Sequence, residues 1–244
     1  MRLGTFYGIG VGPGDPGLVT VKAVAVLAAT AHVFVPKARV ASDSLALDIA
    51  HRYLRADAEV RELVFPMTED RAELGRSWAG SADAIARVLE AGTDACFLTL
   101  GDPLVYSTYV YLLRALATRL PAAQAITVPG VTAFCAGAAL ANFPLGEGKH
   151  VLTVVPAADD LTSVREALQR GGTVVLMKIG RRLRDILALL QEAGLMERAV
   201  FVSRAGLEGQ RVLLDLHTLR PEEPETGYLS VILVHAGKRR PGCR

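Results

Sequence analysis

The chain has 244 residues, of which 51% are apolar and 21% are charged, and its formal net charge is +2. This composition supplies a substantial hydrophobic core, which excludes a disordered chain, and the small charge argues against a dedicated nucleic-acid binder. The three cysteines are too far apart for a zinc knuckle, and so sparse a set of thiols indicates a reducing, cytoplasmic location. The sequence predicts neither a secretion signal nor a membrane-spanning helix.

The first half of the chain alternates short runs of β-forming residues with helical stretches. The expected strands cover residues 6–11, 32–35, 60–65, 96–100 and 125–128. The expected helices cover residues 19–30, 44–54, 79–91 and 105–119. Such alternation implies parallel strands joined by helical crossovers, and therefore an open α/β sheet.

The second half repeats the alternation with one difference. A helix over residues 131–141 precedes strands at 150–155, 173–178, 199–203, 211–215 and 229–234, with helices at 161–170 and 182–193. No helix separates the last two strands, which predicts a mixed sheet. We therefore expect two α/β lobes with about five strands each, residues 1–129 and 130–244.

The segment YGIGVGPGDPG at residues 7–17, which covers most of the first expected strand and the loop after it, has the glycine content of a nucleotide phosphate site. A dinucleotide fingerprint needs its helix directly after the glycines, whereas residues 13–17 delay it here. The fingerprint also needs an acid at the end of the second strand, where this chain offers Lys37 and Arg39. A P-loop fails as well, because Leu18 stands where that motif requires lysine. These departures disfavour a phosphate site.

The same loop has a purely structural interpretation. Glycine permits positive φ and proline fixes φ, so GPGDPG can form a rigid corner without any ligand. Asp15-Pro16 and Asp102-Pro103 both match a helix start, with Asp as the N-cap and Pro at the first helical position. The residues alone leave these interpretations open.

Several motifs occur together and in order along the chain. They are GIGVGPGDPGLVTVKA (8–23), FPMTED (65–70), LTLGDPLVYSTYVYL (98–112), VPGVTAFCAGAALANFPL (128–145), VVLMKIGRR (174–182) and VFVSRAG (200–206). This series closely resembles the tetrapyrrole (corrin/porphyrin) methylase family, from about Gly4 to Val234. The resemblance implies two α/β lobes of the class III S-adenosylmethionine methyltransferase type, with an active-site cleft between them.

Within the family, FPMT followed by Trp78 and the LGDPLVYSTYVYL string are most similar to the enzymes that methylate C20 of precorrin-2 in cobalamin biosynthesis. The uroporphyrinogen-III methylases usually read GGDPFIFGRG instead. The resemblance thus implies S-adenosylmethionine as methyl donor and precorrin-3A as product. The cobalt-factor II substrate, or a different ring carbon, stays an alternative.

The resemblance also implies the residues that contact the donor. They are Pro13, Leu100, Gly101, Asp102, Val105, Thr132, Ala133, Met177 and Ala205. The Leu100–Asp102 tripeptide ends the fourth expected strand, where open α/β sheets bind ligands. Each also has a structural alternative: Asp102 and Thr132 can cap helices, and Met177 can fill a core. Gly206 departs from the family pattern, which often has threonine there.

The glycine loop is expected to form the floor of the substrate cleft, its glycines giving a flat surface for a macrocycle. Gly12 is therefore a substrate-binding candidate. Asp15 is a catalytic candidate that faces a pyrrole N–H or removes the proton from the methylated carbon, unless it serves only as an N-cap. Tyr106, expected one helical turn beyond Pro103, is the second candidate, for a positioning role.

A substrate with several carboxylates requires cations around an apolar cleft. Lys37 and Arg39, at the end of the second expected strand, and Arg204 are the substrate-binding candidates. The arginines at 181, 182 and 184 are better explained as a solvated face.

The histidines show no ligand spacing, and we expect no metal site. The resemblance implies a homodimer that acts on a small-molecule tetrapyrrole, without a nucleic-acid or membrane partner. Two other classes stay open. They are a nicotinamide-dependent oxidoreductase and a non-catalytic tetrapyrrole carrier.

Overall fold

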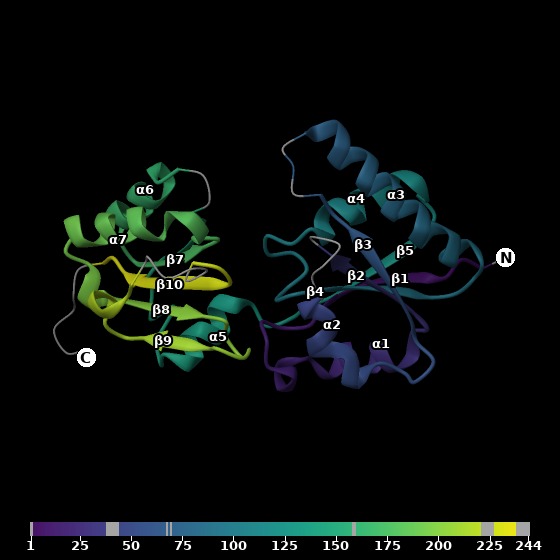
Figure 1. Ribbon diagram of the computed structural model, residues 1–244, viewed down its shortest axis with the longest axis horizontal. Coiled ribbons are helices and arrows are strands. Elements are labelled where there is room, and N and C mark those ends of the chain that lie inside the picture. The colour runs from purple at the N-terminus through teal and green to yellow at the C-terminus, as the bar shows by residue number, and fades with distance from the viewer. Residues whose placement is uncertain are drawn as a thin grey trace. The chain divides into compact units, whose positions relative to one another are not determined.

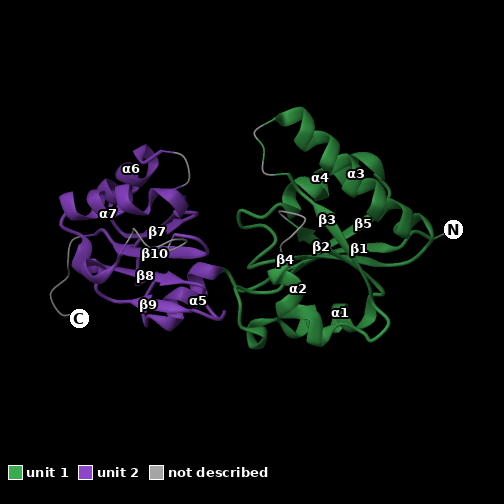
Figure 2. Ribbon diagram, in the orientation of Figure 1, with its two compact units in different colours: residues 1–132 green, residues 133–244 purple. Residues whose placement is uncertain are grey.

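The computed structural model describes residues 2–37, 44–66, 68, 70–157, 160–220 and 227–237 (Figure 1). It divides into two compact units, Met1–Thr132 and Ala133–Arg244 (Figure 2). The sequence placed the division after Pro129, whereas the units divide where helix α5 (Ala133–Leu140) begins. Each unit is described by itself.

The first unit is built on a parallel five-stranded sheet of order β3-β2-β4-β1-β5. The strands are β1 (Thr5–Gly10), β2 (His32–Lys37), β3 (Glu59–Val64), β4 (Ala95–Thr99) and β5 (Gln124–Val128). The predicted open α/β sheet is thus confirmed. Because every strand runs the same way, the loops that follow β1, β4 and β5 meet at one edge.

Helices cover both faces of this sheet, with α1 (Val21–Ala29) and α2 (Leu45–Ala50) on one face and α3 (Arg71–Glu90) and α4 (Tyr109–Arg119) on the other (Figure 1). Short 3-10 helices occupy Pro16–Leu18 and His51–Tyr53. Two expected helix starts were wrong. Helix α3 begins eight residues earlier than expected because the Asp70 carboxylate accepts hydrogen bonds from the N–H groups of Ala72 and Glu73. Helix α4 begins later, at Tyr109.

Tyr109 holds α4 against the sheet. Its ring is fully buried and packs near Phe6 and Phe97, and its hydroxyl lies 2.9 Å from the Thr127 hydroxyl. Burial raises the pKa of Tyr109. A Cβ on Gly8 would lie 2.1 Å from this ring. The first glycine of the loop motif is therefore required by packing against an aromatic side chain.

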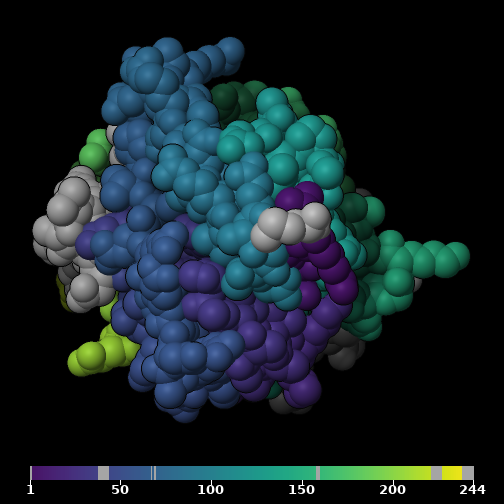
Figure 3. Space-filling view, turned by 90° about the vertical axis from the view of Figure 1, so that its right-hand side faces the viewer, coloured from purple at the N-terminus to yellow at the C-terminus, as the bar shows by residue number. Residues whose placement is uncertain are grey.

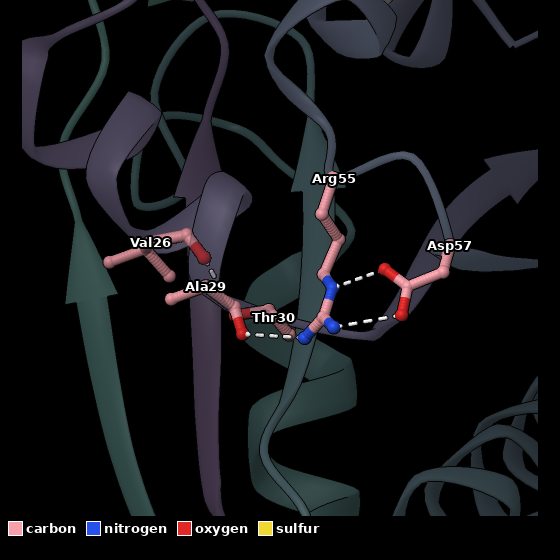
Figure 4. A network of polar contacts seen from close by, with 5 residues as sticks. All are labelled: Val26, Ala29, Thr30, Arg55 and Asp57. Carbon is pink, nitrogen blue, oxygen red and sulfur yellow. Dashed lines mark hydrogen bonds and ion pairs between the residues drawn. The ribbon is translucent and has the colours of Figure 1, made fainter.

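A cavity of about 500 Å³ lies at the amino-terminal ends of the strands of the first sheet, opposite the carboxyl edge. It is lined in part by Arg2, Tyr7, Arg55 and Asp94. Figure 3 views this unit from the side where the chain begins, in purple. The Arg55 guanidinium donates to both carboxylate oxygens of Asp57, with Nη2 lying 2.8 Å from Oδ2. It also donates through Nη1 to the carbonyl of Ala29 (Figure 4). This hydrogen-bonded pairing lowers the pKa of Asp57 and raises that of Arg55. The contacts tie the loop before β3 to the end of α1, which is a structural role.

The second unit has a mixed five-stranded sheet, as predicted, and its strand order is β6-β7-β10-β8-β9. Strands β6 (Leu152–Pro156) and β7 (Thr173–Met177) are parallel. The other pairings are antiparallel and involve β8 (Ala199–Ser203), β9 (Arg211–Leu213) and β10 (Ser230–His235). Helices α6 (Thr162–Arg170) and α7 (Leu183–Glu192) cover one face, and α5 packs against β10 on the other (Figure 1). Short 3-10 helices occupy Gly180–Arg182, Met196–Arg198 and Leu216–Thr218.

In the part of the chain that the structure describes, no helix combines the length and the apolar character that a membrane span requires.

A pH dependence of stability follows from the half-buried His235 at the end of β10. Its ring stacks on Phe143 at 3.9 Å between centroids, and burial is the main cause that lowers its pKa, with Arg198 and His150 adding to the effect and Glu147 opposing it. The unfolded chain therefore binds this proton more readily, and stability should fall as the pH drops below about 6.5.

Urea unfolding at pH 7.5 and pH 5.5 measures this loss. The difference should be smaller in His235→Gln than in the parent. It should be unchanged in the control His217→Gln, whose side chain is exposed. Equal pH differences in all three proteins would contradict the assignment.

Candidate active site

The loops after β1 and β4 are joined at the carboxyl edge of the first sheet. The N–H of Gly101 donates to the carbonyl of Gly12 at 2.7 Å, and the N–H of Gly12 donates to the carbonyl of Gly101 at 3.2 Å. Gly101 has φ +71°, and a Cβ there would meet no atom within 4 Å. The turn after β4 thus presents bare backbone beside open space.

The loop after β5 joins the same arrangement through Gly130. A Cβ on Gly130 would lie 2.2 Å from the carbonyl oxygen of Gly101 and 2.7 Å from backbone atoms of Gly10. A Cβ on Gly10 would lie 2.6 Å from the Gly101 carbonyl oxygen and 2.7 Å from the Gly130 nitrogen. We call Gly10, Gly101 and Gly130 the glycine contact. It brings three loops together with no side chain between them.

Asp102 fastens the glycine contact. Its Oδ1 accepts from the N–H of Leu104 at 2.9 Å, and its Oδ2 accepts from the N–H of Gly130 at 3.1 Å. The expected helix start at Asp102-Pro103 was wrong, because residues 103–108 form a loop and α4 begins at Tyr109. The carboxylate therefore bridges two loops instead of capping a helix.

Replacing Asp102 with Asn should lower the free energy of unfolding by about 1–3 kcal/mol, because an amide offers only one acceptor oxygen and its NH₂ group would face an N–H. Equilibrium urea unfolding measures the change. Asp215→Asn is the matched control, because among the described residues the Asp215 carboxylate accepts from the His217 N–H alone, through Oδ1, and an amide oxygen can replace it. The assignment fails if both variants are equally stable.

Tyr106 lies in the loop between Asp102 and α4, not on a helix as expected. It has φ +53°, and 43% of its surface is exposed. The next residue, Ser107, anchors the loop: its hydroxyl lies 2.8 Å from the Thr99 hydroxyl and accepts from the N–H of Tyr109. A bulky side chain in the left-handed conformation is strained, and such strain clusters at functional sites. Tyr106 stays a candidate on this ground.

Four backbone N–H groups in and directly after the glycine loop donate within the protein. The N–H groups of Val11 and Gly12 donate to Thr99 and Gly101, and those of Gly17 and Leu18 donate to Asp15. Such a loop makes a poor phosphate cradle. The expected flat floor was wrong for two of its glycines, because Gly8 is covered by Tyr109 and Gly10 by the glycine contact.

Asp15 caps the 3-10 helix Pro16–Leu18, its Oδ1 accepting from the N–H of Gly17 at 2.7 Å, while Thr20 caps α1. The structural interpretation of Asp15-Pro16 is thus confirmed for a 3-10 helix. The side chain is exposed at the carboxyl edge. A catalytic role stays a prediction.

The predicted cations differ in their surroundings. The Lys37 ammonium lies 2.6 Å from Glu62 Oε2, and only 13% of its side chain is exposed. A substrate carboxylate at Lys37 would therefore compete with Glu62. Arg39 lies outside the described residues. Arg204 directly follows β8 and donates through Nε to the carbonyl of Glu208 at 2.7 Å.

The remaining predicted residues are distributed over both units. Pro13 is buried in the loop after β1, Val105 is half-buried in the loop before α4, and Thr132 ends the first unit where Ala133 begins α5. Met177 ends β7, and the buried Ala205 lies two residues after β8.

Sequence reasoning missed Gly130 and Ser107 as parts of the site. The signal that could have found Gly130 is the Pro129-Gly130 pair inside the motif at residues 128–145. Among the described residues, no group of three or more His, Cys, Asp or Glu side chains could hold a metal ion.

Comparison with known proteins identifies the family to which the chain belongs. The model of the family described as Tetrapyrrole (Corrin/Porphyrin) Methylases matches residues 5–219. The chain belongs to this family. Cobalt-precorrin-2 C(20)-methyltransferase of Salmonella typhimurium is 39% identical over 95% of this chain and 96% of its own. Precorrin-2 C(20)-methyltransferase of a Sinorhizobium species is 32% identical over 98% of each chain.

A solved structure with a similar fold supports the architecture described above. The uroporphyrin-III C-methyltransferase of Thermus thermophilus, in complex with S-adenosyl homocysteine, superposes with a TM-score of 0.63. The match covers 96% of this chain and 98% of that chain at 22% identity. The predicted fold class, with two five-stranded α/β sheets, is confirmed.

Proposed function

We propose that this tetrapyrrole methylase transfers a methyl group from S-adenosylmethionine to C20 of precorrin-2 in cobalamin biosynthesis. The products are precorrin-3A and S-adenosylhomocysteine. The observation that carries the proposal is that both relatives named above, aligned along nearly the whole chain, are C(20)-methyltransferases. They share the ring position but differ in whether the substrate contains cobalt, so cobalt-precorrin-2 is the alternative substrate.

The turn after β4 fits the proposed donor. Gly101 has open space where a side chain would stand, so a ligand can approach the backbone closely. S-adenosylmethionine carries no phosphate, in keeping with a glycine loop in which the N–H groups of Val11, Gly12 and Gly17 are bonded internally. We assign donor contacts to the nine predicted residues: Pro13, Leu100, Gly101, Asp102, Val105, Thr132, Ala133, Met177 and Ala205. Asp102 acts chiefly by holding the glycine contact in place.

When bound, S-adenosylmethionine supplies an electrophilic methyl group. The work of the protein is then to align the acceptor carbon and to exclude water. Pro13 and Gly12 lie buried beside the turn and bring no polar side chain to it. The methylated carbon must lose a proton, and the exposed Asp15 carboxylate is the proposed acceptor. Tyr106 positions the macrocycle. Lys37, Arg39 and Arg204 bind its carboxylates.

Anaerobic incubation with S-adenosylmethionine and either precorrin-2 or cobalt-precorrin-2 tests the proposal. We expect a product with one added methyl group, placed at C20 by NMR. The substrate that is methylated faster shows whether the enzyme acts on the metal-free or on the cobalt-containing tetrapyrrole. A methyl group at another ring carbon, or no product from either substrate, would contradict the proposal.

Calorimetry distinguishes the proposed methylase from a nicotinamide-dependent oxidoreductase and from a non-catalytic tetrapyrrole carrier. The proposed enzyme binds S-adenosylhomocysteine and not NADP, an oxidoreductase binds NADP, and a carrier binds the tetrapyrrole alone. We also propose that the protein forms a homodimer, which light scattering measures.

A further inference from the structure

Three residues with strained backbone angles lie at strand ends along one edge of the second sheet. Lys178 directly follows β7, Arg204 directly follows β8 and Leu229 directly precedes β10, with φ of +53°, +51° and +49°. Strand β10 pairs antiparallel with both β7 and β8, so the three residues lie at the same edge. Three of the five non-glycine residues with positive φ in the described chain are found here. Glycine would adopt this conformation without strain, yet two of the positions carry cations.

The Arg204 side chain is held at this edge by its own loop. Its backbone N–H donates to the carbonyl of Leu229 at 2.9 Å, and its Nε donates to the carbonyl of Glu208 at 2.7 Å. Within the described part of the chain, no carboxylate lies within ion-pair distance of this guanidinium. An oriented guanidinium that pairs with none of the described carboxylates is suited to an external carboxylate.

The backbone beyond Lys178 is fixed by a close contact between two loops. The N–H of Gly180 donates to the carbonyl of Gly227 at 3.2 Å, and a Cβ on Gly227 would lie 2.1 Å from the Gly180 carbonyl oxygen. The Ser230 hydroxyl also donates to the carbonyl of Gly227 at 2.7 Å. The exposed Lys178 side chain thus starts from a well-defined position, one strand away from Arg204 on the other side of β10.

The surroundings favour an anionic and partly apolar ligand. Two acids of the same unit have partners of their own, because Asp185 pairs with Arg182 at 3.2 Å and Asp160 accepts from the N–H of Thr162. Tyr228, next to Leu229, is 57% exposed and offers aromatic surface. Two strand spacings place the Cα atoms of Lys178 and Arg204 about 10 Å apart. Flexible cations at that spacing can reach two carboxylates of one macrocycle.

We propose that Lys178 and Arg204 form a carboxylate-binding pair for the tetrapyrrole, with Tyr228 against its apolar ring. This inference rests on the proposed function, since it names how that substrate is held. Lys178 was absent from the residues predicted from the sequence.

Lys178→Gln and Arg204→Gln test the pair, with Arg170→Gln as the control because Arg170 is exposed on α6 and pairs with Glu166. Each test variant should raise KM for precorrin-2 about tenfold, as expected for losing one charge-assisted hydrogen bond. The affinity for S-adenosylhomocysteine, measured by calorimetry, should stay within about twofold of the parent. The control should behave as the parent protein in both measurements.

Uroporphyrin, a stable polycarboxylate tetrapyrrole, gives a second readout that needs no turnover. Its affinity, followed by fluorescence, should fall in both test variants and should depend less on salt than in the parent. Unchanged KM and unchanged uroporphyrin affinity in both variants, or no uroporphyrin binding by the parent, would overturn the pair. Failure of the parent to methylate precorrin-2, with uroporphyrin binding still lost in the variants, would instead overturn the proposed function alone.

Discussion

A Gly130→Ala variant is expected to lose about 3 kcal/mol of unfolding free energy in the first unit. The added Cβ would lie 2.2 Å from the Gly101 carbonyl oxygen and 2.7 Å from the backbone of Gly10. These neighbours are backbone atoms of adjoining strand ends, so no rotamer change can relieve the clash. The turn that carries Gly101 must then shift, and donor affinity should fall together with stability.

Urea unfolding followed by the fluorescence of Trp78, the only tryptophan in the chain, reports on this unit. Gly80→Ala is the matched control, because Gly80 lies within α3 and a Cβ there meets nothing within 4 Å. Alanine should stabilise that helix by about 0.5–1 kcal/mol. A Gly130→Ala protein whose stability lies within about 1 kcal/mol of the parent would show that the three loops of the glycine contact are not tightly packed.

A Gly101→Ala variant should bind S-adenosylhomocysteine at least about tenfold more weakly while losing only about 1–2 kcal/mol of stability. The Cβ would enter the open space beside the turn, which the donor is proposed to use, and the φ of +71° strains any side chain. The expected effect is therefore larger on ligand binding than on folding.

Gly194→Ala controls for the backbone strain in this comparison. Gly194 follows α7 in the second unit and has φ +65°, and a Cβ there would also meet no atom within 4 Å. It should lose similar stability and keep the affinity of the parent, measured by isothermal calorimetry. Equal affinities for Gly101→Ala and the parent would remove Gly101 from the donor site.

Most of the fold could be predicted because its signals are local. Alternating strand and helix patterns indicated the parallel sheet, and the missing helix before the last strand indicated the mixed one. The start of α4 could not be predicted, because Asp102-Pro103 has the local pattern of a helix start. Its carboxylate instead accepts from Gly130, a residue far along the chain. The start of α3 was missed although Asp70 was a visible cap signal.

The site shows the same division between local pattern and long-range contact. Motif resemblance pointed to Gly101 and Asp102, but the reason for Gly8 lies in Tyr109 and the reason for Gly10 lies in Gly130. The pairing of Lys37 with Glu62 could not be predicted either, because Glu62 lies on the neighbouring strand and not nearby in the sequence. Strain at Tyr106 became visible only in the backbone angles.

A crystal structure with bound S-adenosylhomocysteine tests most directly whether the turn after β4 holds the methyl donor. We expect the ligand against the backbone of Leu100–Asp102, with the open side of Gly101 facing it. A ligand bound away from this turn, or a dinucleotide whose pyrophosphate lies on the loop of Gly12, would contradict that placement and the function proposed from it.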